Sequence, residues 1–138
     1  MGVAIYIHIE YRHRRKKKYY HSNEEYLIPR YIYLFRAMGL PSKFGTPLYP
    51  CRGLPGNVTT ETFNEYNCDK PDFHHASWLY THEFQECIDY VRDELTKSQQ
   101  DYNYEEDELL QEYQNLCNIM KEGDADGEPA RIVFWFDN

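Results

Sequence analysis

Asp72–His82 reads DFHHASWLYTH and places three histidines, a serine and a tryptophan in one short segment. On a β-strand, His75 and Ser77 would lie on the same face, as a nucleophilic serine and its base must. The segment therefore raises the hypothesis of a small hydrolase or phosphodiesterase centred on His75 and Ser77. Two absences weaken it, because the sequence has no second His-x-Ser/Thr triplet and no nucleophile-elbow glycines flank Ser77.

Metal binding is the second chemistry to consider, with Cys51, Cys68, His74 and His75 as candidates. Zinc ligands typically come in closely spaced pairs, whereas these cysteines are isolated and adjacent histidines point in different directions. We therefore predict neither a metal site nor another cofactor. The N-terminus lacks the features of a secretory signal, so the four cysteines are expected to be reduced thiols.

Recognition of anions is indicated at two places. The run from 12 to 18 precedes Tyr19 and Tyr20, so its charges could hold phosphates while a ring stacks on a base. Its cations are Arg12, Arg14, Arg15, Lys16, Lys17 and Lys18. The alternative is a solvated hairpin tip whose repulsion discourages edge-to-edge pairing. Farther along, Arg52, His75 and Trp78 could form a more specific pocket from a guanidinium, an imidazole and an aromatic face.

Charge is distributed unevenly along the 138 residues. The net charge of −8 divides into +5 over residues 1–70 and −13 over residues 71–138. Because the acidic half repels polyanions, an extended nucleic acid is disfavoured as a partner. A local anion site or a protein partner fits this asymmetry better, and the 17% aromatic content supplies rings for either.

The length of the chain is that of one domain, so a single domain over residues 1–138 is predicted. No segment approaches the roughly 20 consecutive apolar residues that a membrane span needs, so no membrane partner is expected. With neither a span nor a signal sequence, a cytoplasmic location is predicted.

The periodicity of apolar residues predicts an α+β fold. Val3, Ile5, Ile7 and Ile9 alternate with polar residues, which indicates a strand over about 3–11. Residues 132–136 are apolar on both faces and indicate a central strand over about 131–136. We expect these two strands to pair in a small antiparallel or mixed sheet, with the helices packed on it in two layers.

The remaining elements follow from stripes, caps and turn residues. Helices are predicted at 29–39, 59–66, 81–97 and 105–121, a short strand at 76–80, and an irregular loop rich in proline and glycine at 40–58. Cys87 and Cys117 fall on apolar helical faces and are expected to be small core residues.

Four segments together resemble one family. They are MGVAIYIHIEYR at the start, CRGLPGNV at 51–58, HHASWL at 74–79 and RIVFWFDN at 131–138. In these places the chain is similar to small bacteriophage and prophage proteins that open MGVDI…EYR, carry GLP-x-x-V and a histidine–serine–tryptophan segment, and end near RIVFWFDN. It departs from that pattern at Ala4, where aspartate is usual, and at His74, where serine is common.

The resemblance carries no reaction with it, but it implies a context: a phage accessory protein made in the cytoplasm of a bacterial host. Small proteins of this kind commonly bind host factors, including defence systems, or sequester their nucleotide signals. We therefore expect a binding protein rather than an enzyme, one that engages a host protein or a small anionic, nucleotide-like ligand. A structural or assembly protein that forms an oligomer is the remaining alternative.

Overall fold

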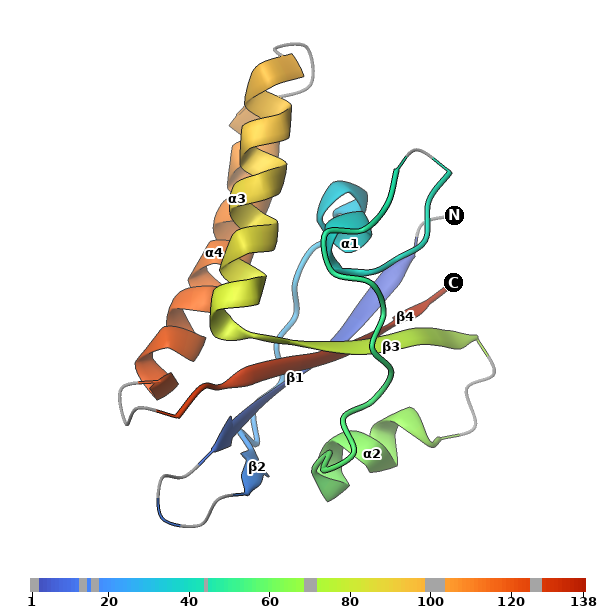
Figure 1. Ribbon diagram of the computed structural model, residues 1–138, viewed down its shortest axis with the longest axis vertical. Coiled ribbons are helices and arrows are strands. Elements are labelled where there is room, and N and C mark those ends of the chain that lie inside the picture. The colour runs from blue at the N-terminus through green and yellow to red at the C-terminus, as the bar shows by residue number, and fades with distance from the viewer. Residues whose placement is uncertain are drawn as a thin grey trace.

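The structure of the chain, a computed structural model, describes residues 3–12, 15, 18–43, 45–68, 72–98, 104–124 and 128–138. The elements follow in the order β1-β2-α1-α2-β3-α3-α4-β4 (Figure 1). The strands are β1 (Ala4–Arg12), β2 (Tyr19–His21), β3 (Phe73–Tyr80) and β4 (Arg131–Asp137). The helices are α1 (Ile32–Met38), α2 (Thr60–Tyr66), α3 (Thr81–Ser98) and α4 (Tyr104–Gly123). The predicted α+β fold is confirmed.

The sheet is antiparallel, with the strand order β2-β1-β4-β3. β4 lies between β1 and β3, and its residues 131–136 are all buried, as the apolar run predicts. β1 pairs with β4 from Ala4↔Asp137 to Glu10↔Arg131, which confirms the expected pairing of the first and last strands. β2 is short and pairs with β1 only at its far end, from Glu10 to Arg12.

The main hydrophobic core lies between one face of the sheet and the helices α1, α3 and α4 (Figure 1). Ile7 and Ile9 of β1 contribute to it, since alternate residues of a strand share a face. The apolar side chains of α3 that follow helical spacing are buried there, namely Phe84, Ile88, Val91 and Leu95. Most of those of α4 are buried too, namely Leu110, Tyr113, Leu116, Cys117 and Met120.

Helix α2 covers the opposite face, so the fold has part of a third layer beyond the two predicted. The hydroxyl of Thr62 donates to Glu10 at 2.7 Å, and the ring of Tyr66 meets that of Trp135 edge-on at 5.1 Å. Because Glu10 alternates with Ile9 along β1, its side chain lies on the face away from the main core. Both faces of the sheet are therefore covered near its centre.

Two boundaries differ from the sequence prediction. β3 begins at Phe73, so His74 and His75 lie within the strand rather than in a loop before it. α1 begins at Ile32, three residues after Pro29, and ends at Gly39, whose φ of 133° suits glycine at the C-cap. In the part of the chain that the structure describes, no helix has the length and apolar character needed to cross a membrane.

Candidate functional site

The two adjacent histidines lie at a β-bulge in β3. Between His74 and Ser77 the strand uses one residue more than its partner β4, and His75 takes up the difference with a left-handed φ of 55°. His74 Nδ1 lies 2.6 Å from His75 Nδ1, and His74 Nε2 lies 3.0 Å from Asn138 Oδ1. With the Asn138 oxygen as acceptor, neutral His74 carries its proton on Nε2 and accepts from His75.

The bulge separates His75 from Ser77 and breaks the two-residue alternation that would place them together. His75 is exposed, whereas Ser77 is fully buried and its Oγ accepts a hydrogen bond from the backbone N–H of Arg52 at 2.9 Å. A substrate in solvent therefore has no access to the Ser77 hydroxyl. This placement argues against a hydrolase that uses His75 and Ser77.

Arg52 and Trp78 are close together, as the anion-pocket hypothesis requires, but the guanidinium already has a partner. Its two terminal nitrogens donate to the carboxylate of Glu83 at 2.8 and 2.5 Å. The guanidinium carbon Cζ of Arg52 lies 4.6 Å from the centre of the Trp78 ring and 5.3 Å from the centre of the Tyr49 ring. In the described part of the chain the ring of His75 bonds to His74 and not to Arg52.

This ion pair affects the protonation of both partners. Burial pushes the pKa of Glu83 upward, but hydrogen bonds from Arg52 and from the backbone N–H of Tyr80 outweigh it and hold the pKa below its usual range. The hydrogen bond to Glu83 likewise raises the pKa of Arg52. Arg52 therefore joins the proline-rich loop to β3 and α3, and the Glu83 carboxylate balances its charge.

The basic run is described only in part. Arg14, Lys16 and Lys17 lie outside the described residues, while Arg12 pairs with Glu128 at 3.6 Å and Arg15 and Lys18 are exposed. Of the two tyrosines predicted to stack on a base, Tyr20 is 49% exposed, whereas Tyr19 packs against Arg131. Its ring lies 3.6 Å below the Arg131 guanidinium, and its hydroxyl donates to the carbonyl of Pro129 at 3.2 Å.

A buried polar cluster on the α2 face was not foreseen from the sequence. Arg131 Nε donates to Glu10 Oε1 at 2.8 Å, its Nη2 lies 2.7 Å from the same oxygen in an ion pair, and both side chains are almost fully buried. Glu10 Oε2 also accepts from the hydroxyls of Thr59 and Thr62, at 2.5 and 2.7 Å. Asn57 Oδ1 accepts from Arg131 Nη1 at 2.8 Å. With its charges paired and its lone pairs occupied, the cluster serves structure.

A chain of hydrogen bonds links two histidines to α2. The backbone N–H of Asn23 donates to His21 Nδ1 at 2.8 Å, so the proton of neutral His21 resides on Nε2. That nitrogen lies 2.8 Å from His8 Nδ1, and His8 Nε2 lies 2.9 Å from Glu65 Oε1. The protons therefore all point toward Glu65. Only the β1–β2 pairing brings His8 and His21 together, so sequence spacing gives no sign of this relay.

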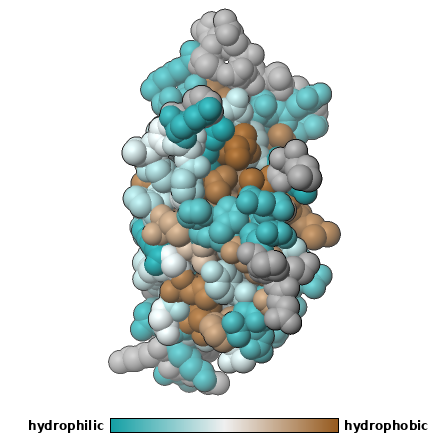
Figure 2. All heavy atoms as spheres, turned by 90° about the vertical axis from the view of Figure 1, so that its right-hand side faces the viewer, coloured by the Kyte–Doolittle hydropathy of each residue, from teal (hydrophilic) through white to brown (hydrophobic). Residues whose placement is uncertain are grey.

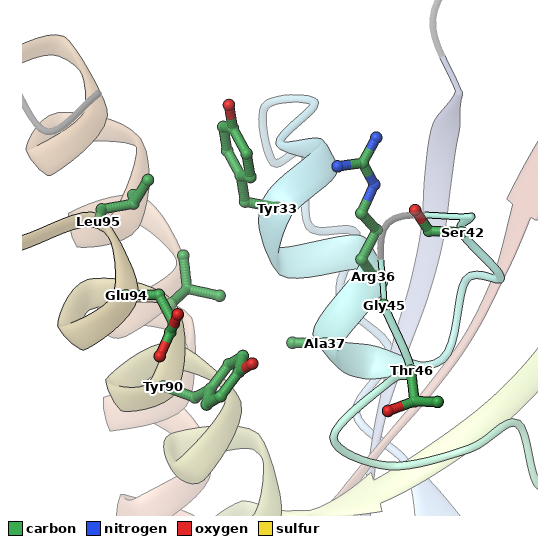
Figure 3. A pocket seen from close by; sticks show the side chains of 10 residues that line it. Tyr33, Arg36, Ala37, Ser42, Gly45, Thr46, Tyr90, Glu94 and Leu95 are labelled. Atoms are coloured by element: carbon green, nitrogen blue, oxygen red, sulfur yellow. The ribbon is translucent and has the colours of Figure 1, made fainter. Parts of the chain in front are cut away.

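A cavity lies between α1, α3 and the turn that contains Ser42, Gly45 and Thr46 (Figure 3). Its volume is about 300 Å³, at the lower end of small-molecule sites. α1 contributes Tyr33, Arg36 and Ala37, the turn contributes Ser42, Gly45 and Thr46, and α3 contributes Tyr90, Val91, Glu94 and Leu95. The sequence indicates the edge of the core, or alternatively a partner-binding surface, for Tyr33, and it gives no sign of a cavity at Tyr90.

Among the described residues, no group of three or more histidine, cysteine, aspartate or glutamate side chains is arranged to hold a metal ion. Comparisons of the chain with protein-family models, with curated proteins and with solved structures found no match.

Proposed function

We propose that this chain is a ligand-binding protein rather than an enzyme, and that the cavity between α1, α3 and the turn with Ser42, Gly45 and Thr46 takes a small, planar, anionic ligand. The observation that carries the proposal is the composition of the cavity wall. It combines two tyrosine rings, one guanidinium, one carboxylate and two hydroxyls around about 300 Å³. The groove beside β1 and the hollow beside Pro29 and α4 have no arginine or lysine in their linings.

The aromatic walls come from different helices. Tyr33 projects from α1 and Tyr90 from α3, and Figure 3 shows Ala37 on the α1 side of the space between the helices. The two tyrosines are 39% and 45% exposed, so their rings are accessible to a ligand. The short side chain of Ala37 leaves room between the helices. Such walls favour a ligand with a flat ring, because the face of any aromatic ring can stack on tyrosine.

The polar groups define the rest of the ligand. Arg36 can hold a phosphate or carboxylate with two parallel hydrogen bonds. Across the cavity, Glu94 can accept hydrogen bonds from an amino group, and the hydroxyls of Ser42 and Thr46 can bond to a sugar or a second polar edge. A base, a sugar and a phosphate together satisfy this set, so the ligand class is nucleotide-like.

The resemblance to phage proteins supports a biological setting for such binding. Some host defence systems use nucleotide-like molecules as signals. A phage accessory protein that sequesters such a signal would protect the phage from the defence. The setting is part of the proposal, as is a location in the cytoplasm of the bacterial host.

Calorimetric titration with a panel of nucleoside monophosphates tests the proposal, with free nucleosides and inorganic phosphate as partial ligands. We expect at least one nucleotide to bind, and Arg36→Gln to weaken it about tenfold, or about 1.4 kcal/mol. Arg92→Gln is the matched control, because Arg92 is an α3 arginine outside the cavity that pairs with Asp89 at 3.7 Å. No binding by any nucleotide, or equal losses in both variants, would overturn it.

A further inference from the structure

The first strand has an open edge. β1 runs from Ala4 to Arg12, but β2 pairs only with Glu10–Arg12. The hydrogen bond from Ser22 N to Ile9 O, at 3.1 Å, continues this pairing by one residue. Beyond it the chain runs back toward α1 (Figure 1), and no described strand pairs with residues 4–8 of β1 on this side.

The direction of the backbone groups at this edge follows from the pairing. Ile9 O points toward the β2 side, and backbone groups in a strand alternate in direction every residue. The N–H and C=O groups of Ile5 and Ile7 therefore point the same way, out of the sheet at the open edge. A row of such groups is a template for another strand.

A groove lies beside this edge. Its volume is about 480 Å³, and its walls are the edge of β1, the segment 23–27 and one side of α2. Ile7 lines the groove although its side chain is buried in the core, so its backbone is the part that faces the groove. Leu27, at one wall, is 95% exposed, which leaves an apolar side chain without cover in the described chain.

Glutamates line both walls of the groove, and the 23–27 wall also carries the side chains of Tyr26 and Leu27. Its lining includes Glu24, Glu25, Glu61 and Glu65 and contains no lysine or arginine. Glu61 and Glu65 belong to α2, on the polar face of the sheet, whereas Tyr26 packs against the main core.

We infer that β1 accepts an extended segment of a partner protein as an additional strand, with basic side chains toward Glu61 and Glu65 and apolar ones toward Tyr26 and Leu27. Backbone hydrogen bonds to Ile5 and Ile7 hold the partner strand. Its successive side chains point alternately to the two walls of the groove, so each wall selects every second side chain. This site at the edge of β1 is separate from the α1–α3 cavity, and it takes a peptide segment rather than a small ligand.

The probe for this inference is a capped six-residue peptide of alternating lysine and valine, measured by calorimetric titration and by amide hydrogen exchange. We expect binding, with slowed exchange at the amides of Ile5 and Ile7. Two further peptides carry N-methyl groups on the odd or on the even backbone nitrogens. Since a strand bonds through one edge, one of these peptides should lose at least tenfold in affinity while the other binds as before.

Charge is tested separately with Glu25→Gln/Glu61→Gln, whose carboxylates lie in the groove. We expect a loss of about tenfold that added salt reduces, while Glu108→Gln/Glu122→Gln, which removes the same charge from exposed positions of α4, leaves affinity unchanged. Equal binding of both methylated peptides, spermidine binding as tightly as the lysine peptide, or no peptide binding would each overturn the inference. Dimerisation that protects the same two amides in the absence of peptide would also overturn it, because a second copy would then occupy the edge.

Discussion

Helices cover both faces of the sheet, but different interactions hold them in place on the two faces. Under α1, α3 and α4 the contacts are apolar, with Leu110 and Ile132 among the fully buried side chains. Under α2 the central contact is the Glu10–Arg131 ion pair, surrounded by threonine hydroxyls. Apolar packing depends on volume and tolerates exchange between similar shapes, whereas a buried ion pair depends on every partner being present.

The largest expected effect comes from breaking the ion pair on the α2 face. Arg131→Met leaves the buried Glu10 carboxylate without its cation, so we expect the free energy of unfolding to fall by about 3–5 kcal/mol. Urea denaturation followed by circular dichroism measures it. The double variant Glu10→Leu/Arg131→Met removes both charges and should recover much of the loss. A double variant less stable than Arg131→Met would contradict the explanation.

The apolar face should respond to volume instead. Leu110→Ala creates a cavity in the core under α4 and should lower the free energy of unfolding by roughly 2–5 kcal/mol. Leu110→Met keeps the volume and should cost less than about 1.5 kcal/mol. The same denaturation experiment compares the two variants. Equal losses in both would mean that this face does not depend on volume alone.

This difference also explains how much of the structure could be predicted from the sequence. The alternation of Ile5, Ile7 and Ile9 and the α3 stripe from Phe84 to Leu95 indicate both the element and the face that it buries. Glu10 follows the same alternation, but alternation says only that it points away from the main core. Its partner Arg131 is 121 residues away, and no periodic pattern joins them.

The candidate sites show the same limit. The composition of 72–82 drew attention to His75 and Ser77, but the bulge that separates them depends on register with β4. The cavity at Tyr33 and Tyr90 depends on how α1 packs against α3. The open edge of β1 depends on where β2 stops, and a basic hairpin gives no sign of that position.

A smaller effect is expected at Ser77, on the strand at the edge of the apolar face. Ser77→Ala removes the acceptor for the backbone N–H of Arg52 and should lower the free energy of unfolding by about 1–3 kcal/mol. Thermal denaturation measures the loss, and ligand titration at the α1–α3 cavity should be unaffected. Loss of a hydrolytic activity in this variant, with stability unchanged, would instead restore the nucleophile hypothesis.

The smallest expected effect is the dependence of the Arg52–Glu83 pair on pH. Because the pKa of Glu83 is lowered in the folded chain, the pair stabilises the fold above the pKa of the unfolded chain. That contribution is lost as pH falls through the folded pKa. Glu83→Gln should therefore be less stable than the natural chain at pH 7, and the difference should narrow as the solution is acidified toward pH 3.

Asp93→Asn is the matched control for this measurement, since Asp93 pairs with Lys97 at 3.0 Å on the exposed side of the same helix. Exposed pairs contribute little, so its difference from the natural chain should be small at every pH. Urea denaturation at a series of pH values gives both curves. A difference in unfolding free energy between Glu83→Gln and the natural chain that stayed constant with pH would mean that the Glu83 carboxylate is not the titrating group. The loop at 51–53 would then depend on the stacking of Arg52 on Trp78 and on backbone bonds to β3.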